Sequence, residues 1–101
     1  MSDVVTLKLV SGEEVVASLV SKLSPTLDSN VAAYRVSKPQ TLQFRPFGNS
    51  GQMGLAFIPW TLSNPTLREV DIPATFVMCM VDTDEEVARQ YLEQTTGIAL
   101  A

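Results

Sequence analysis

The stretch from Thr6 to Lys22, TLKLVSGEEVVASLVSK, carries apolar residues at every second position on both sides of a break at Ser11–Glu13. Alternation with a period of two is typical of a strand that buries one face, and a break that holds a glycine is typical of a hairpin turn. A three-residue loop at 11–13 would place apolar residues opposite one another. The resulting pairs are Leu9 with Val15, Leu7 with Ala17 and Val5 with Leu19. The sequence therefore predicts an antiparallel hairpin near the start of the chain.

The second face of this hairpin is too apolar to be fully solvated, because Val10, Val16 and Val20 lie on it. The whole chain is 46% hydrophobic and 18% charged, whereas an average soluble domain is roughly 25% charged. A chain of 101 residues forms a single domain with a modest core. We therefore expect other copies of the same protein to cover this face.

Three more extended stretches follow the hairpin, at about 32–44, 53–60 and 72–81. Pro39 interrupts the first of them, which predicts a bulge or bend near 37–39. The sequence PFGNSG at 46–51 predicts a turn after it. The last two stretches are nearly continuous apolar runs with internal prolines, so we expect strands that are buried on both faces.

A helix is predicted over about 84–96. Thr83 and Glu86 have the spacing of a capping box, and Gly97 is well placed as the residue that follows the helix end. Val87, Ala88, Tyr91 and Leu92 form one apolar stripe at helical spacing. The helix should therefore lie against the strands.

Several kinds of function are disfavoured by composition alone. The chain has no histidine and one cysteine, Cys79, which excludes an internal disulfide, the usual zinc sites and histidine-dependent catalysis. We expect no enzyme, no catalytic residue, no metal and no cofactor. The formal net charge of −4 argues against binding to nucleic acid by bulk attraction. No apolar run approaches the ~18 residues of a membrane helix, so we expect no membrane partner and a cytoplasmic protein.

The spacing of Leu7, Leu9, Gly12, Val15, Ala17 and Leu19 resembles the first signature of the Sm-like (LSm, Hfq-related) family, and in particular its divergent members of marine-phage type. The resemblance covers about 4–81. It implies a mainly β fold, a small five-stranded, strongly bent Sm-like (SH3-like) barrel, here with a C-terminal α-helix. It also implies a homo-oligomeric ring, in which the fourth strand of one subunit pairs with the fifth strand of the next, and the host-cell cytoplasm if a phage encodes the chain.

The chain departs from the family pattern at several positions. Ala17 replaces the usual glycine, and Leu23 and Leu27 stand where the family has the aspartate and asparagine of its RNA-binding loop, although Asp28 and Asn30 lie nearby. The short Arg-Gly turn of the family is replaced by the longer segment 61–71. These departures weaken the transfer of RNA binding more than the transfer of the fold.

Cations and aromatic residues alternate along the third predicted strand, a combination that holds phosphates and stacks unpaired bases. A strand with one core face and one solvated face would show the same pattern. In a ring, each cation would recur once per subunit, so that local positive charge could arise despite the acidic total. The candidate nucleic-acid-binding residues are Asn30, Arg35, Lys38, Arg45 and Arg68.

The sequence thus favours a non-enzymatic, ring-forming protein that binds single-stranded RNA or DNA, with a role in nucleic-acid processing. The alternative is a structural or adaptor protein, such as a phage-assembly component, with the same ring and no nucleic-acid binding.

Overall fold

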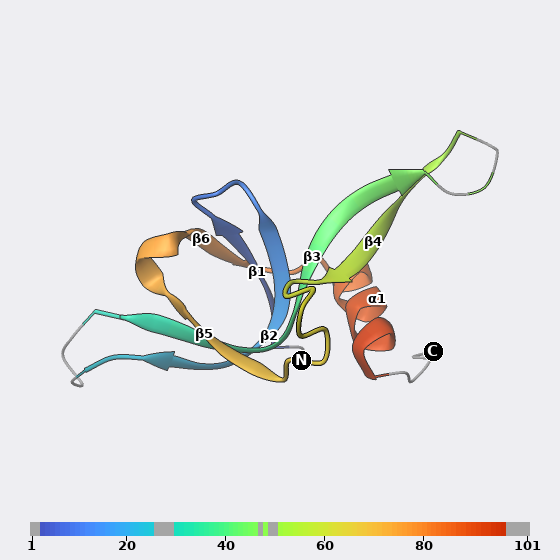
Figure 1. The fold of residues 1–101 in the computed structure, drawn as a ribbon. Coiled ribbons are helices and arrows are strands. Elements are labelled where there is room, and N and C mark those ends of the chain that lie inside the picture. Colours follow the sequence, from blue (N-terminus) through green and yellow to red (C-terminus); the bar gives the residue numbers. More distant parts are fainter. Residues whose placement is uncertain (1–2, 26–29, 47, 49–50, 97–101) are drawn as a thin grey trace.

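The computed structural model describes residues 3–25, 30–46, 48 and 51–96. Within this part, the chain forms six antiparallel strands, one short 3-10 helix and one α-helix at the C-terminal end (Figure 1). The elements are β1 (Val4–Leu9), β2 (Glu14–Leu23), β3 (Ala33–Pro46), β4 (Met53–Pro59), β5 (Glu69–Pro73), η1 (Ala74–Phe76), β6 (Val77–Asp82) and α1 (Glu85–Thr96). The prediction of a mainly β chain with a C-terminal helix is confirmed.

The β1–β2 hairpin forms, but with a register that differs from the predicted one. Leu7 lies opposite Val15 and Val5 opposite Ala17, and the Leu9 N–H donates to the Glu13 carbonyl at 2.9 Å. The three-residue loop is therefore 10–12 and not 11–13. The reason is Gly12, whose φ of 94° suits the last position of such a loop, where a left-handed residue is needed.

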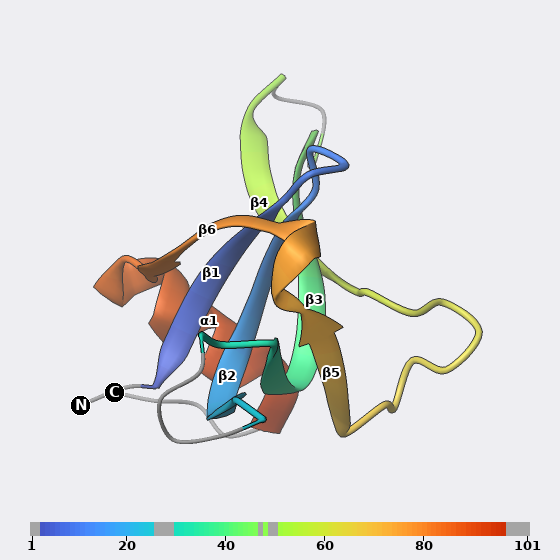
Figure 2. The ribbon, with the colours of Figure 1, turned by 90° about the vertical axis from the view of Figure 1, so that its left-hand side faces the viewer.

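The sheet has six strands where five were expected, and it does not close into a barrel. Its order is β4-β3-β2-β1-β6, with β5 paired to β3 outside this path. The predicted strand 72–81 is divided after Pro73, where the Ala74 N–H still donates to the Ala32 carbonyl at 2.8 Å. The short helix η1 then carries the chain from β5 to β6, which pairs with β1 (Figure 2). β5 and β6 are thus joined through η1 without pairing with each other.

β3 is the longest strand, and the predicted bulge near 37–39 is confirmed. Val16 lies opposite Gln40 but Ser18 lies opposite Ser37, so β3 contains one residue more than β2 over this interval. Before the bulge β3 pairs with β5, and after it with β4. The second half of β3 and β4 form an arm that projects away from the rest of the sheet (Figure 1).

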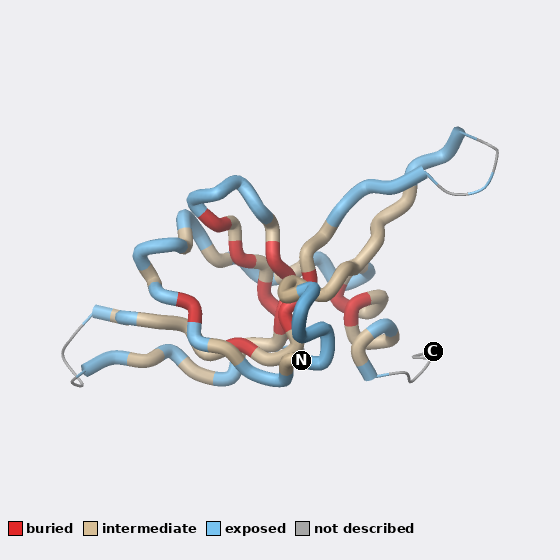
Figure 3. Tube along the Cα trace, viewed as in Figure 1, coloured by how far each residue is buried: buried red, intermediate tan, exposed pale blue. Residues whose placement is uncertain are grey.

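Buried apolar residues form two clusters on opposite faces of the sheet. The buried positions lie along the body of the sheet and on α1, and not on the outer part of the arm (Figure 3). The first cluster consists of Leu7, Leu9, Val15, Ala17, Val36 and Ile72, and Trp60 packs against it. The second consists of Val4, Val16, Ala88 and Tyr91. The expectation that another copy covers the second hairpin face is therefore wrong at Val16, since α1 of the same chain covers it; Val10 and Val20 remain exposed.

The two end strands of the sheet keep exposed apolar side chains. On β6, Met80 packs against the core, but Met78 and Val81 are 65% and 54% exposed, and Cys79 is also exposed. Phe44 and Met53 are exposed on the arm. Within one chain, β4 and β6 are therefore not buried on both faces, so the prediction of two fully covered strands is wrong for the single chain. An apolar strand at a sheet edge is a ready template for pairing with another chain.

The helix begins one residue later than predicted because its cap is Asp84, not Thr83. The Asp84 carboxylate accepts from the Glu86 N–H at 3.1 Å, and the Asp84 carbonyl accepts from the Ala88 N–H at 2.8 Å. The Thr83 hydroxyl is instead hydrogen-bonded to the Thr6 hydroxyl of β1 at 2.8 Å. Gly97, the expected C-terminal residue, lies outside the described residues. No helix among those described is long and apolar enough to span a bilayer.

Asp84→Ala should lower the free energy of unfolding by about 1 kcal/mol, because it removes the side chain that satisfies a backbone N–H of the first helical turn. Asp84→Asn retains an acceptor oxygen and should recover most of the loss. Urea unfolding followed by circular dichroism measures both. Equal losses for the two variants would show that the carboxylate acts through charge and not as a cap.

Candidate functional site

Of the five predicted binding residues, the structure brings Lys38 and Arg68 together and places Asn30, Arg35 and Arg45 elsewhere. Asn30 is exposed in the connection between β2 and β3. Arg45 is exposed near the far end of the arm, where it donates to the Gln43 side chain at 3.1 Å. These two regions lie toward opposite ends of a molecule that is 53 Å long (Figure 1). Within one chain, Asn30 and Arg45 cannot contact the same small ligand.

Arg35 is engaged by an acidic neighbour. It lies opposite Asp71 in the β3–β5 ladder, and its Nε and second terminal nitrogen donate to the two Asp71 carboxylate oxygens at 2.8 and 3.1 Å. These hydrogen bonds hold the pKa of Asp71 below its usual value. The Asp71 carboxylate occupies one edge of the guanidinium and offsets its charge toward a phosphate. Arg35 is therefore a poor anion-binding residue in this structure.

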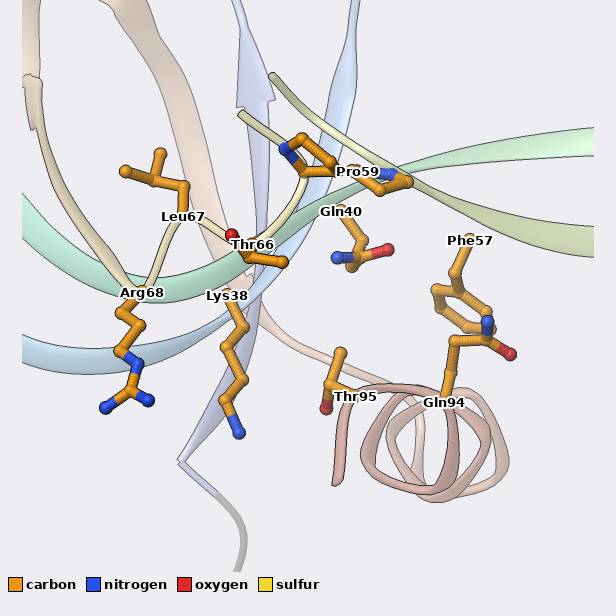
Figure 4. Close-up of a pocket in the computed structure, with 10 residues that line it drawn as sticks. Lys38, Gln40, Phe57, Pro59, Thr66, Leu67, Arg68, Gln94 and Thr95 are labelled. Atoms are coloured by element: carbon orange, nitrogen blue, oxygen red, sulfur yellow. The ribbon is translucent and has the colours of Figure 1, made fainter. Parts of the chain in front are cut away.

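Lys38 and Arg68 are brought together. The Lys38 N–H donates to the Arg68 carbonyl at 2.8 Å, and both side chains line one hollow beside α1. Their charged ends extend in the same direction (Figure 4). In the part of the chain that the structure describes, neither side chain has an acidic partner. Two unpaired cations at one place can hold an anion that a single exposed cation would bind weakly.

The walls of the hollow combine amide, hydroxyl and aromatic groups. Gln40 of β3 and Phe57 of β4 contribute from the sheet, and Gln94 and Thr95 contribute from α1. The Gln40 carboxamide is directed into the hollow (Figure 4) and has no hydrogen-bond partner among the described residues. The volume is about 350 Å³, which lies within the range of small-ligand sites.

Sequence reasoning missed Gln40, Phe57, Gln94 and Thr95. Gln40 and Phe57 belong to strands whose pairing decides what they face, and the helical residues reach the hollow only because α1 packs on the sheet. The alternation of cations and aromatic residues along β3 was the available signal, and it identified Lys38. Nothing in the sequence placed Arg68, thirty positions later, beside it.

Lys38 has an unusual backbone conformation. Its φ is 51°, and it is the one non-glycine residue with positive φ among those described. It also precedes Pro39, and a residue before proline favours extended conformations. A left-handed conformation costs an L-residue with a Cβ roughly 1–2 kcal/mol. Such local strain persists only where neighbouring groups hold it.

The side chains that line the hollow have the chemistry of an anion-binding surface. No group of three or more potential metal-ligating side chains occurs in the ranges that the structure describes. The polar groups of the hollow are a lysine, an arginine, amides and hydroxyls, which can neutralise a phosphate and hydrogen-bond a base edge. Phe57 adds an aromatic surface that a base could contact. The arrangement therefore suits recognition of a small anionic unit.

No protein-family model matches this chain, and no curated protein is significantly similar to it.

Lys38→Gly should be more stable than Lys38→Ala by about 1 kcal/mol, because glycine has no Cβ to oppose a φ of 51°. Both variants remove the same charged side chain, so their difference isolates the backbone. The measurement is urea unfolding of the two proteins side by side. If alanine proves as stable as glycine, Lys38 is not left-handed in solution.

Proposed function

We propose that the protein is a non-enzymatic, Sm-like protein that assembles into a homo-oligomeric ring and binds single-stranded RNA or DNA. The observation that carries the nucleic-acid part is the convergence of Lys38 and Arg68 in a hollow that Phe57 also lines. The observation that carries the assembly part is that β4 and β6 each pair with one strand only among the described residues, and that both carry exposed apolar side chains.

The strand path supports the Sm-like interpretation. The resemblance in sequence implies that the fourth strand of one subunit pairs with the fifth strand of the next. Here the corresponding strands are β4 and β6, and they lie at the two ends of the sheet order β4-β3-β2-β1-β6. Pairing β6 of one copy with β4 of another would join sheets edge to edge and cover Met78 and Val81. In a closed ring, neither of these two edges would be free.

The geometry of the hollow favours a single strand over a duplex. A phosphate between Lys38 and Arg68 would leave its base free to contact Phe57, with the Gln40 and Gln94 amides available to the base edge. Bases of a duplex are paired and stacked, so their faces are not accessible to an aromatic side chain. Repetition of the hollow around a ring would bind successive nucleotides and offset the acidic charge of each subunit.

Light scattering should show an assembly of several subunits for the unmodified protein. Met78→Glu should shift it toward the monomer, because the change places charge at the apolar β6 edge. Leu62→Glu is the matched control, since Leu62 is also an exposed apolar residue but lies in the segment between β4 and β5. A monomeric unmodified protein, or equal effects of the two variants, would contradict assembly through β6.

Fluorescence anisotropy with a labelled oligouridylate or oligothymidylate tests the binding site. Lys38→Ala and Arg68→Ala should each weaken binding about fivefold or more, since each removes a charge-assisted phosphate contact. Each should also reduce the steepness of the plot of log affinity against log salt by ~0.7 per engaged contact. Arg35→Ala, on the same strand but outside the hollow, should leave both quantities unchanged.

The structural or adaptor alternative keeps the same ring without a nucleic-acid ligand. It is favoured by the net charge of −4 and by the ion pair that engages Arg35. Absence of any salt-dependent binding by an intact ring would select this alternative.

A further inference from the structure

The hydroxyl of Tyr91 makes a contact that burial of the ring does not require. Tyr91 belongs to α1, and its ring is fully buried in the cluster that packs the helix on the sheet. The ring contacts Phe57 edge to face, with ring centroids 6.2 Å apart. The hydroxyl reaches the Ser37 and Lys38 carbonyl oxygens at 3.0 and 2.8 Å. Burial raises the pKa of this hydroxyl, so it stays protonated at neutral pH and able to donate. It thus donates its one proton at the bulge of β3, where two carbonyl oxygens share it.

The bulge is held from the other side by the segment between β4 and β5. The Lys38 N–H donates to the Arg68 carbonyl at 2.8 Å, and the Trp60 N–H donates to the Pro39 carbonyl at 3.1 Å. Lys38 is therefore fixed at both its N–H and its carbonyl, in a conformation that it would not adopt by preference. Only the Tyr91 contact comes from a side chain, so a single substitution can remove it without disturbing the sheet ladder.

We propose that Tyr91 is a positioning residue of the Lys38–Arg68 site and acts through the backbone of Lys38. The left-handed turn at Lys38 directs its side chain away from the strand and beside Arg68 (Figure 4). In an extended conformation the side chain would follow the regular alternation of β3 and separate from Arg68. Helix α1 therefore belongs to the binding site in two ways: Gln94 and Thr95 line the hollow, and Tyr91 sets its geometry. The ligand class is that of the proposed function, on which this inference rests.

The first test is a double-mutant cycle in oligouridylate affinity. Tyr91→Phe keeps the buried ring and should weaken binding about fivefold in the otherwise unmodified protein. In a Lys38→Ala background the same change should have no effect, because the side chain that Tyr91 positions is gone. Tyr34→Phe, on β3 and packed against the other core cluster, is the matched control and should leave affinity unchanged. Equal effects of Tyr91→Phe in both backgrounds would overturn the proposal, since a general loss of stability acts without regard to Lys38.

The second test needs no ligand. Hydrogen exchange at the Lys38 amide should become at least several-fold faster in Tyr91→Phe, while exchange at the Leu7 amide in the core of β1 should change much less. Parallel acceleration of both amides would indicate global destabilisation and overturn the positioning role. If exchange behaves as expected but the unmodified protein binds no oligonucleotide, the proposed function fails while the Tyr91–Lys38 coupling stands. If the unmodified protein binds and Tyr91→Phe binds equally well, the positioning proposal fails while the function stands.

Discussion

The bulge at Lys38–Pro39 is the point on which the rest of the structure depends. The last β3–β5 pair is Ser37 with Glu69, and the first β3–β4 pair is Gln40 with Pro59. Between them the ladder of β3 changes partner, and both ends of the segment 60–68 are hydrogen-bonded to the bulge. Because Pro39 has no N–H and Lys38 turns to positive φ, a continuous ladder on that side is interrupted here. One strand can therefore belong both to the curved body and to the projecting arm.

The same bulge connects the sheet to the helix. Tyr91 is buried against Val4 and Val16 on the face that α1 covers, and its hydroxyl meets the bulge carbonyls. The hydroxyl contact therefore links α1 to one position along β3, in addition to the apolar packing. The helix end then reaches the hollow of Lys38 and Arg68. Strain at one backbone position, helix placement and the convergence of two cations are thus parts of one arrangement.

Among the described residues, ion pairs engage some of the cations and not others. Arg35 is held by Asp71, and Arg89 is held by Glu86 and Glu93 along the helix. Each acidic partner is a neighbour in the ladder or lies three or four positions away on the helix, where such pairs form readily. Among the residues that the structure describes, Lys38 and Arg68 form no ion pair, which leaves them available to an external anion. In an acidic protein, the capacity to bind an external anion therefore depends more on which cations lack an internal ion pair than on the total number of cations.

Much of the fold could be predicted from the sequence by itself. The alternation around Gly12 predicted the hairpin, and the apolar runs predicted the late strands. Pro39 predicted the bulge, and the apolar stripe that contains Tyr91 predicted the terminal helix. Each of these elements depends on the local period of apolar residues or on the backbone limits of glycine and proline. The exact hairpin register, the division of the last strand at Pro73 and the cap at Asp84 required the structure. In each case the local sequence is compatible with two arrangements that differ by one or two residues, and contacts with distant segments determine which of the two forms. The site depends on tertiary structure. Arg35 contacts Asp71, 36 residues later, because β3 pairs with β5, and Lys38 contacts Arg68 because Arg68 directly precedes β5. No local sequence pattern encodes which strands become neighbours.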